Sequence, residues 1–228
     1  MKLWESILNL FFPLKCPFCS RIVEEPAPCA RCRKELPWVE SGGVLRRLPG
    51  GAECVSPLYY EGRVRDCLLR MKFHDYPAAA EPLGRLIAQC AAEELSGRFD
   101  VVTWAPVGPK RLKKRGYDQA RLLAESACRC WETAPERLLT KRRDNPAQSS
   151  LESADARKRN VKNVYSPAPG ARIAGRRVLL VDDIVTTGST LSECARILQE
   201  NGAADVVCAA AATPRRMEGS LPEEKISN

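Results

Sequence analysis

Strand-like and helix-like segments alternate along most of this chain, and that alternation limits the folds open to it. Apolar runs of strand character lie at 54–60, 100–107, 176–183 and 205–212, and segments with helix spacing lie at 62–73, 81–95, 117–131 and 190–202. Strands this apolar need cover on both faces, as in a parallel sheet flanked by helices. The pattern therefore predicts an α/β fold with one domain over 50–215 and a polar tail over 216–228.

The first 45 residues differ in texture, and we expect them to form a small separate module. SGG at 41–43 and PGG at 49–51 then bracket a linker-like segment. The module carries two CxxC pairs, whose members are Cys16, Cys19, Cys29 and Cys32. A CxxC turn directs both sulfurs to one point, so two such turns complete a tetrahedral, closed site for structural Zn²⁺ that would serve folding or docking. The alternatives are a redox pair, which needs only one CxxC between a strand and a helix, and ordinary buried thiols.

The extreme N-terminus is apolar, but it lacks the marks of a signal peptide or a membrane span. Glu5 and Asn9 interrupt the apolar run, and no small-residue cleavage site follows. We expect an amphipathic helix there, packed on the body of the protein. Its apolar face would consist of Leu3, Trp4, Ile7, Leu8 and Phe11. The cysteines outside the two pairs are scattered among apolar residues, which fits free thiols in a reducing cytoplasm.

The positive charge of the chain is concentrated in two regions. The formal net charge is +8 at pH 7, and basic residues dominate KRLKKR at 110–115 and recur between Arg137 and Lys162. For any single residue, solvated loop surface is the simpler interpretation. Two basic regions on one fold nevertheless favour a polyanionic partner, which would be either a diphosphate or a nucleic acid.

The stretch VLLVDDIVTTGST at 178–190 combines a buried strand, two acids and a hydroxyl-rich turn. In open parallel sheets ligands bind beyond the carboxyl ends of the strands, where Asp182 and Asp183 would lie. The turn that follows opens a helix, so its amides and hydroxyls form an anion site. This turn consists of Thr186, Thr187, Gly188, Ser189 and Thr190.

Carboxylates accept hydrogen bonds from vicinal diols, so a ligand with a cis-diol beside a phosphate suits both halves of this stretch. Ribose 5-phosphate is such a ligand. The stretch matches neither a Walker loop nor a GxGxxG loop. The simpler alternative is a hydrated acid pair, with Ser189 or Thr190 as an ordinary helix N-cap.

VLLVDDIVTTGST resembles the phosphoribosyl-pyrophosphate (PRPP) motif of type I phosphoribosyltransferases. The resemblance implies that Asp182 and Asp183 contact the ribose hydroxyls and that the TTGST backbone holds the 5′-phosphate. It also implies a Mg²⁺ ion that bridges the ribose hydroxyls and the pyrophosphate. The expected fold is then a type I phosphoribosyltransferase-like parallel sheet flanked by helices, with a small N-terminal zinc-ribbon or knuckle module.

Three further segments resemble the ComF branch of these proteins, whose members are linked to DNA uptake in competent bacteria. They are the four-cysteine N-terminus, APVGPKRLKKRGYDQA at 105–120 and RRDNPAQSSLESADARKRNVKNVY at 142–165. The chain departs from the branch pattern at several positions. Those departures are Gly108 for a proline, Tyr117 for Phe, Asp118 for Asn, Asn145 for Thr and Tyr165 for Phe.

The resemblance also implies roles for individual residues. The loop from Pro106 and Val107 to Arg111 would meet the pyrophosphate, and cations would stabilise its departure. Those cations would be Lys110, Arg111 and Arg142. Arg115, Gly116 and Gln119 fall in the next signature, and a mobile hood would carry Gln148, Arg157 and Asn160. Either acid of the pair could stabilise positive charge or relay a proton.

Two residues near the end of the 62–73 segment are open to interpretation. Lys72 matches a lysine typical of the branch, but a cation is also favoured at a helix end by the helix dipole. His74 is the only histidine, and no partner for it can be named from the sequence.

Three functions are compatible with these features. The chain could be a phosphoribosyltransferase, with an acceptor that the sequence does not identify. It could instead be a non-catalytic protein that binds single-stranded DNA and uses PRPP or another nucleotide as a regulatory ligand. In a third interpretation, the cysteine module is an adaptor that docks the domain on a helicase or another component of the uptake machinery.

Overall fold

The computed structural model describes residues 13–40, 46–142 and 164–215 of the 228-residue chain. The expected N-terminal helix, the central part of the expected hood and the expected polar tail lie outside these residues. None of the helices in the described part is long and apolar enough to cross a membrane.

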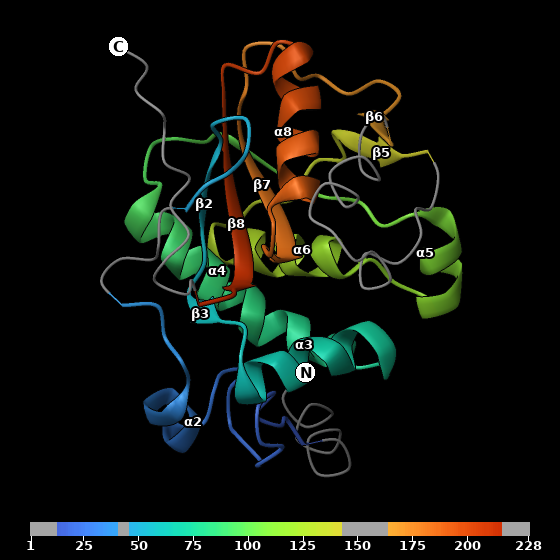
Figure 1. Ribbon diagram of the computed structural model, residues 1–228. Coiled ribbons are helices and arrows are strands. Elements are labelled where there is room, and N and C mark those ends of the chain that lie inside the picture. The colour runs from blue at the N-terminus through green and yellow to red at the C-terminus, as the bar shows by residue number, and fades with distance from the viewer. Residues whose placement is uncertain (1–12, 41–45, 143–163, 216–228) are drawn as a thin grey trace, which may run out of the picture.

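A mainly parallel sheet forms the centre of the fold (Figure 1). Across the sheet the strands are β1 (Arg46–Arg47), β2 (Glu53–Val55), β8 (Asp205–Thr213), β7 (Arg177–Ile184) and β4 (Val101–Trp104). β3 (Leu58–Tyr59) continues the line of β2 along β8, and in the described part of this sheet only β1 pairs antiparallel. Val178 to Val181 of β7 are fully buried, so this strand needs cover on both faces. The predicted α/β class is confirmed.

Three helices that follow the predicted spacing closely share one hydrophobic core with one face of the sheet. They are α3 (Gly62–Phe73), α4 (Ala80–Glu94) and α6 (Gln119–Cys130), with the 3₁₀ helix η1 (Pro77–Ala79) before α4. α4 and α6 pack closely, because a Cβ at Gly84 would lie 2.7 Å from the carbonyl oxygen of Leu123. Glycine at this position lets the two backbones approach each other.

The other face is covered by α8 (Ser189–Glu200) and a small antiparallel pair of strands. β5 (Leu139–Lys141) and β6 (Tyr165–Pro167) form this pair, and both pack with α8 into a second hydrophobic core. Figure 1 shows α8 beside β7 and β8, with β5 and β6 beyond it. The segment outside the described residues, 143–163, connects these two strands.

The structure differs from the sequence expectations in three places. The basic segment expected as loop surface forms α5 (Pro109–Arg115), which starts on a proline and ends at the left-handed Gly116. α5 buries none of its residues, so it has no apolar period to reveal it. The linker expected between residues 41 and 51 contains β1, and the strand expected at 54–60 is divided into β2 and β3 around Pro57.

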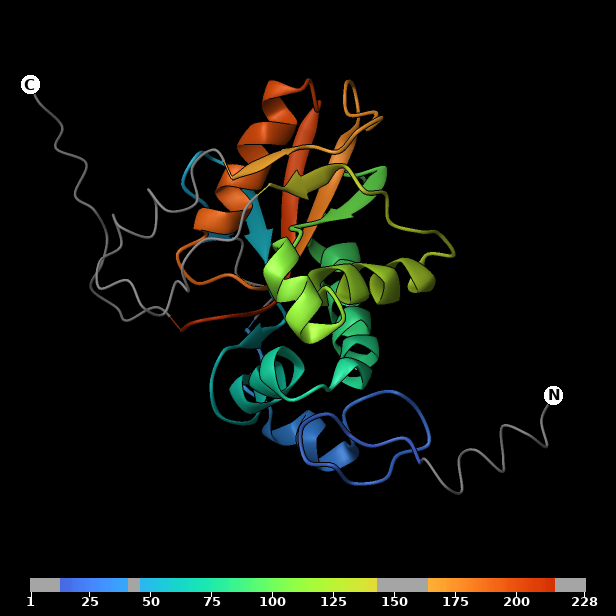
Figure 2. The same cartoon turned by 90° about the vertical axis from the view of Figure 1, so that its right-hand side faces the viewer.

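The cysteine-containing segment lies against α3 at one end of the molecule, as both views show (Figures 1 and 2). It consists of a turn closed by the Lys15–Ile22 bridge and the short helix α2 (Ala30–Glu35). Cys16, Cys29 and Cys32 of this segment share the hydrophobic core of α3, which includes Cys67 and Met71. The backbone amide of Tyr59 donates to the carbonyl of Pro37 (2.8 Å), which joins this segment to the end of the sheet.

Candidate functional site

The acid pair lies where β7 ends, at the carboxyl edge of the central sheet. Asp183 is 8% exposed, and its backbone amide donates to Oδ1 of Asp182 at 2.8 Å. Asp182 is partly exposed. Burial, and then the neighbouring charge of Asp183, raise the pKa of the Asp182 carboxyl above its ordinary value. The two acids are therefore unlike, because Asp182 holds its proton more tightly than a carboxyl in water does.

Lys72 supplies the counter-charge for the pair from the last turn of α3. Its Nζ lies 3.0 Å from Oδ2 of Asp183, and both side chains are largely buried. Of the two interpretations of this lysine, the ion pair supports a place in the site. His74 follows it at the C-cap of α3 and is exposed.

The hydroxyl-rich turn joins β7 to α8 and places several donors at one point. Gly188 has φ +77° and occupies the N-cap position of α8. Oγ1 of Thr187 and Oγ of Ser189 are 2.9 Å apart. Among the described residues, no backbone carbonyl accepts from the amides of Thr186, Thr187 or Gly188. These amides and the start of a helix together make an arrangement suited to an anion.

The segment that contains β1 packs against this turn. The guanidinium of Arg46, on β1, donates to the carbonyl of Val185 (3.3 Å). Leu48 is buried, and its Cδ2 would lie 2.8 Å from a Cβ placed on Gly188. The segment expected as a linker therefore packs directly against the TTGST turn.

A second loop, at the end of β4, is held beside the acid pair. The amide of Ala105 donates to the carbonyl of Val181 (2.9 Å), and the amide of Val107 donates to Oδ2 of Asp118 (3.0 Å). Asp118 also caps α6 through the amide of Arg121 (3.3 Å). Burial raises the pKa of the Asp118 carboxyl. The branch pattern has Asn where this chain has Asp118. The aspartate still supplies an oxygen that accepts from the amide of Val107, in the loop that also contains Pro106.

A pocket of about 420 Å³ opens between the end of α3 and α5. Its basic lining residues are Lys72, Arg111, Lys114 and Arg115. Phe73, Tyr117 and one acid, Asp75, complete the lining. The Arg115 side chain donates to Oε1 of Gln119 (2.8 Å), and the Tyr117 hydroxyl donates to the carbonyl of Met71 (2.7 Å). Burial lowers the pKa of Arg115, and the charge of Asp183 acts against that shift.

The expected site residues are brought together only in part. The acid pair, the TTGST turn, the Pro106–Arg111 loop, Arg115 and Gln119 converge on the same edge of the sheet, and Lys110 and Gly116 lie on and after α5. The Arg142 guanidinium donates to Oγ of Ser166 on β6 (2.9 Å). Gln148, Arg157 and Asn160 lie outside the described residues.

Three residues that line this pocket, Phe73, Asp75 and Lys114, were not singled out in the sequence. Phe73 is 65% exposed, lies off the buried apolar face of α3 and directly follows Lys72. An aromatic residue beside that lysine is the signal that could have identified it.

The four paired cysteines form a second, separate site. Their sulfurs all lie within 4.8 Å of one another, and those of Cys19 and Cys29 are 3.6 Å apart. Tetrahedral Zn–S bonds of about 2.3 Å require sulfurs about 3.8 Å apart, so this donor set fits such an ion. The amide of Cys29 points to the Cys16 sulfur (3.5 Å). Since both pairs meet at one point, the geometry favours a metal over a single redox pair.

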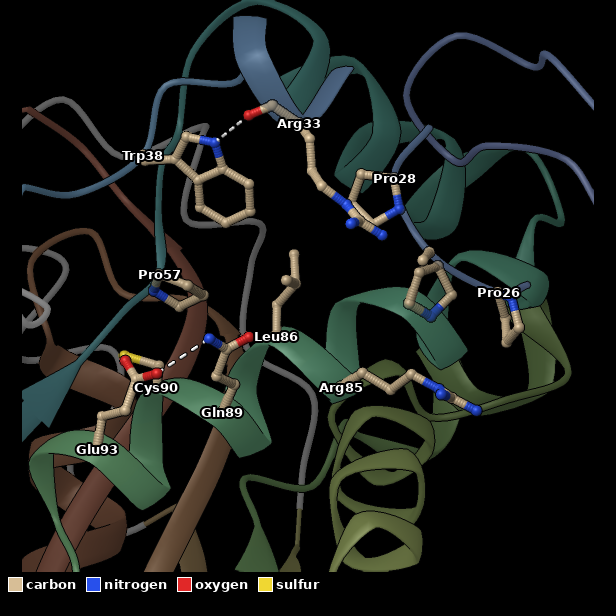
Figure 3. A pocket seen from close by; sticks show the side chains of 12 residues that line it. Pro26, Pro28, Arg33, Trp38, Pro57, Arg85, Leu86, Gln89, Cys90 and Glu93 are labelled. Carbon is tan, nitrogen blue, oxygen red and sulfur yellow. Dashed lines mark hydrogen bonds between the residues drawn. The ribbon is translucent and has the colours of Figure 1, made fainter. Parts of the chain in front are cut away.

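Another pocket, of about 550 Å³, lies between the cysteine-containing segment and α4 (Figure 3). Trp38 stands on one side of it, where its indole nitrogen donates to the carbonyl of Arg33 (2.7 Å). Arg85 and Gln89 of α4 stand on the other side. Its lining includes neither acid of the pair and no residue of the TTGST turn, so it is distinct from the candidate ligand site.

Comparison with known proteins agrees with this geometry. A family described as the phosphoribosyl transferase domain matches residues 73–227. The chain belongs to this family. It is 31% identical over 201 residues to the DNA utilization protein YhgH of Salmonella typhimurium, which covers 84% of this chain and 80% of that protein. These matches place it in the ComF branch that the sequence motifs indicated.

Two further relatives carry names linked to competence. Competence protein F of Haemophilus influenzae is 27% identical over 84% of this chain and 86% of that protein. Competence protein ComFC of Bacillus subtilis is 25% identical over 83% of this chain and 73% of that protein.

Gly188→Ala should destabilise the protein through both its backbone and its neighbours. A left-handed alanine costs about 1–2 kcal/mol, and the contact with buried Leu48 adds about 1 kcal/mol or more. The matched control is Gly170→Ala, because Gly170 has φ +76° but no atom lies within 4 Å of the place that a Cβ would take there. Urea unfolding should show the larger loss for Gly188→Ala, and equal losses would contradict the close contact at the turn.

Asp182→Asn should stabilise the unliganded protein at neutral and higher pH. Because the folded-state pKa of Asp182 is raised, its contribution favours the folded state at low pH and is lost as the pH rises above about 4. Asparagine removes that loss, so the gain in Tm over the unmodified chain should be greater at pH 8 than at pH 5. The exposed Asp66→Asn serves as control. A gain that does not change with pH would contradict the unfavourable burial of this carboxylate.

Proposed function

We propose that this chain binds PRPP together with Mg²⁺ and transfers its phosphoribosyl group to an acceptor. The observation that carries the proposal is the acid pair beside the TTGST turn, on one strand and the helix that follows it. The family match, which spans these residues, also supports it. The carboxylates suit the ribose diol, and the turn amides suit the 5′-phosphate.

The donor set at the acid pair also suits Mg²⁺. This ion prefers oxygen ligands and is commonly held by one or two carboxylates plus substrate phosphates. Asp182 and Asp183 supply carboxylate oxygens beside the place proposed for the diol. When bound, the ion would neutralise part of the pyrophosphate charge, while the remaining ligands would come from PRPP itself.

In the transfer, an electron pair of the acceptor forms a bond to C1 of the ribose. The bond from C1 to the pyrophosphate oxygen breaks, and pyrophosphate leaves with that electron pair. A proton lost by the acceptor passes to solvent or is relayed by an acid of the pair. Lys110, Arg111 and Arg142 are proposed to stabilise the leaving charge, and cations placed in advance lower such a barrier without reorganisation.

A second candidate function is a non-catalytic role in DNA handling. It is favoured by the names of the relatives, which refer to DNA utilization and competence, and by the exposed basic residues of α5. In this role PRPP or another nucleotide would be a regulatory ligand, single-stranded DNA would contact the basic surface, and the cysteine module would dock on a partner. Binding of single-stranded DNA that weakens steeply with salt, without pyrophosphate release on any acceptor, would favour it.

Calorimetric titration of the full chain with PRPP and Mg²⁺ should show binding that depends on the acid pair. Asp183→Asn should weaken PRPP by about tenfold or more, because a charged acceptor for the diol is lost. Asp66→Asn, on the exposed side of α3, should leave the affinity unchanged. Equal affinity in Asp183→Asn and the unmodified chain would contradict the assignment of the diol.

We further propose that the cysteine site holds Zn²⁺. The purified chain should contain one zinc ion, and Cys29→Ser should release it and lower Tm by about 5 °C or more, since a structural metal contributes directly to folding. Cys130→Ser is the control, because that thiol is exposed and lies outside the cluster. Metal analysis that finds no zinc, with a disulfide in the cluster, would instead favour a redox pair.

A further inference from the structure

The pocket of about 550 Å³ between the cysteine-containing segment and α4 has no part in the proposed function (Figure 3). Its volume lies in the range of sites that hold a small ligand or a short piece of peptide. Four prolines, Trp38 and Leu86 form the apolar part of its lining. A groove lined by an aromatic ring is typical of sites that bind proline-containing peptides in extended form.

Trp38 presents the face of its ring to this pocket. Because its indole nitrogen donates to the carbonyl of Arg33 (2.7 Å), the polar edge of the ring is already satisfied. Figure 3 shows the ring on the same side of the pocket as Pro57, and the amide of Val39 donates to the carbonyl of Pro57 (3.0 Å). This end of the pocket suits a proline ring or an aliphatic side chain.

Two arginines give the pocket a positive end. The side chains of Arg33 and Arg85 extend away from the Trp38 end, while Glu93 lies nearer to it (Figure 3). Among the described residues, no hydrogen bond or ion pair involves the exposed guanidinium of Arg33. Arg85 donates from Nε to Glu81 (3.1 Å), and a guanidinium has further N–H groups to donate. Carboxylates are the partners that such groups bind most strongly.

The last described residues of the chain lie close to the Trp38 end of this pocket. The guanidinium carbon of Arg215 stands 4.1 Å from the centre of the Tyr59 ring. Leu58, the residue before Tyr59, pairs with Trp38 on one side and with Ala212 of β8 on the other. Since neighbouring strands lie about 5 Å apart, the chain leaves the sheet beside the pocket.

The sequence that follows has the composition that this pocket fits. Residues 216–228 contain the run LPEE at 221–224, in which a leucine and a proline precede two glutamates. Six residues separate Arg215 from the proline, and they span up to about 20 Å when extended. The pocket offers its apolar end first and its arginines beyond, which is the order of these residues along the chain.

We propose that residues 221–224 dock in this pocket of the same chain, with the proline ring against Trp38 and the two glutamates on Arg33 and Arg85. Docked in this way, the segment closes the pocket to other acidic peptides and holds the cysteine-containing segment against α4. The competing occupants are the same residues of a second copy and an acidic segment of a partner protein. The chain's own segment is favoured, because a short flexible tether keeps it at an effective concentration in the millimolar range.

The test titrates a labelled peptide with the sequence of residues 217–226 onto two full-length chains. One is the unmodified chain, and the other carries Glu223→Lys and Glu224→Lys, so that its own segment no longer competes. The altered chain should bind the peptide about tenfold more tightly than the unmodified chain, in which the tethered segment occupies the pocket. Fluorescence anisotropy measures both dissociation constants.

Two further changes test the contacts themselves. Arg33→Glu, added to the altered chain, should weaken the peptide by about tenfold, because a charged partner of the glutamates is lost. Lys34→Glu is the matched control, since this exposed lysine follows on α2 and does not line the pocket. A peptide with Pro222→Ser should bind about threefold more weakly or worse, because it buries less apolar surface against Trp38.

Each contrary result identifies a different occupant or site. Equal affinity of the two chains would overturn the proposal, because the pocket would then be open to the acidic segment of a partner. Peptide binding to neither chain would overturn it as well. If Arg33→Glu and Lys34→Glu had equal effects, the peptide would bind elsewhere and the proposal would fail. Sedimentation that shows a dimer of the unmodified chain but not of the altered chain would assign the pocket to a second copy, against the proposal.

Discussion

The ion pair between Lys72 and Asp183 is the interaction on which the site depends, because it joins the helical layer to the end of the central strand β7. A buried strand that ends in two adjacent carboxylates is costly, since burial and mutual repulsion both disfavour their charged forms. Lys72 offsets that cost at Asp183, while the pKa of Asp182 stays raised. The two acids thus differ, because one carboxylate is paired with a cation and the pKa of the other is raised by burial and by its neighbour. Such a pair costs stability, as groups held ready for a ligand commonly do.

The helix that carries Lys72 also connects the site to the cysteine cluster. Near its start, the Arg63 guanidinium donates to Glu35 of α2 (2.8 Å) and contacts the Cys32 sulfur (3.7 Å). Near its end, Arg70 donates to the carbonyl of Pro17. The cysteine-containing segment therefore holds α3 along its length, and α3 presents Lys72 and Phe73 to the site. In physical terms the small module is part of the support of the candidate site.

The sequence predicted most of what depends on periodicity and little of what depends on distant contacts. The strands β4, β7 and β8 and the helices α3, α4, α6 and α8 follow from apolar patterns, and the acid pair follows from its place after a strand. α5 did not, because a helix that buries nothing has no apolar period and is recognised only by Pro109 and Gly116 at its ends. The ion-pair partner of Lys72 could not be predicted from the sequence either. Asp183 is distant from it in the sequence, and only the packing of α3 brings the two side chains together. Leu48 behind Gly188 is a similar case.

The kinds of cation in the site fit the proposed transfer. A diol placed on the acid pair would take up oxygens that Lys72 now contacts, so that ammonium group must be able to change partners. Lysine suits this, because its charge is a compact point on a flexible stem. Arg115 is different, since Gln119 and the ring of Phe73 hold it in one position before any ligand arrives. A guanidinium that is already fixed loses little conformational entropy when an anion binds, and the affinity is higher because that cost is small. The site therefore places a movable charge at the acids and a fixed one in the pocket, and this division matches a ligand that enters beside the acids.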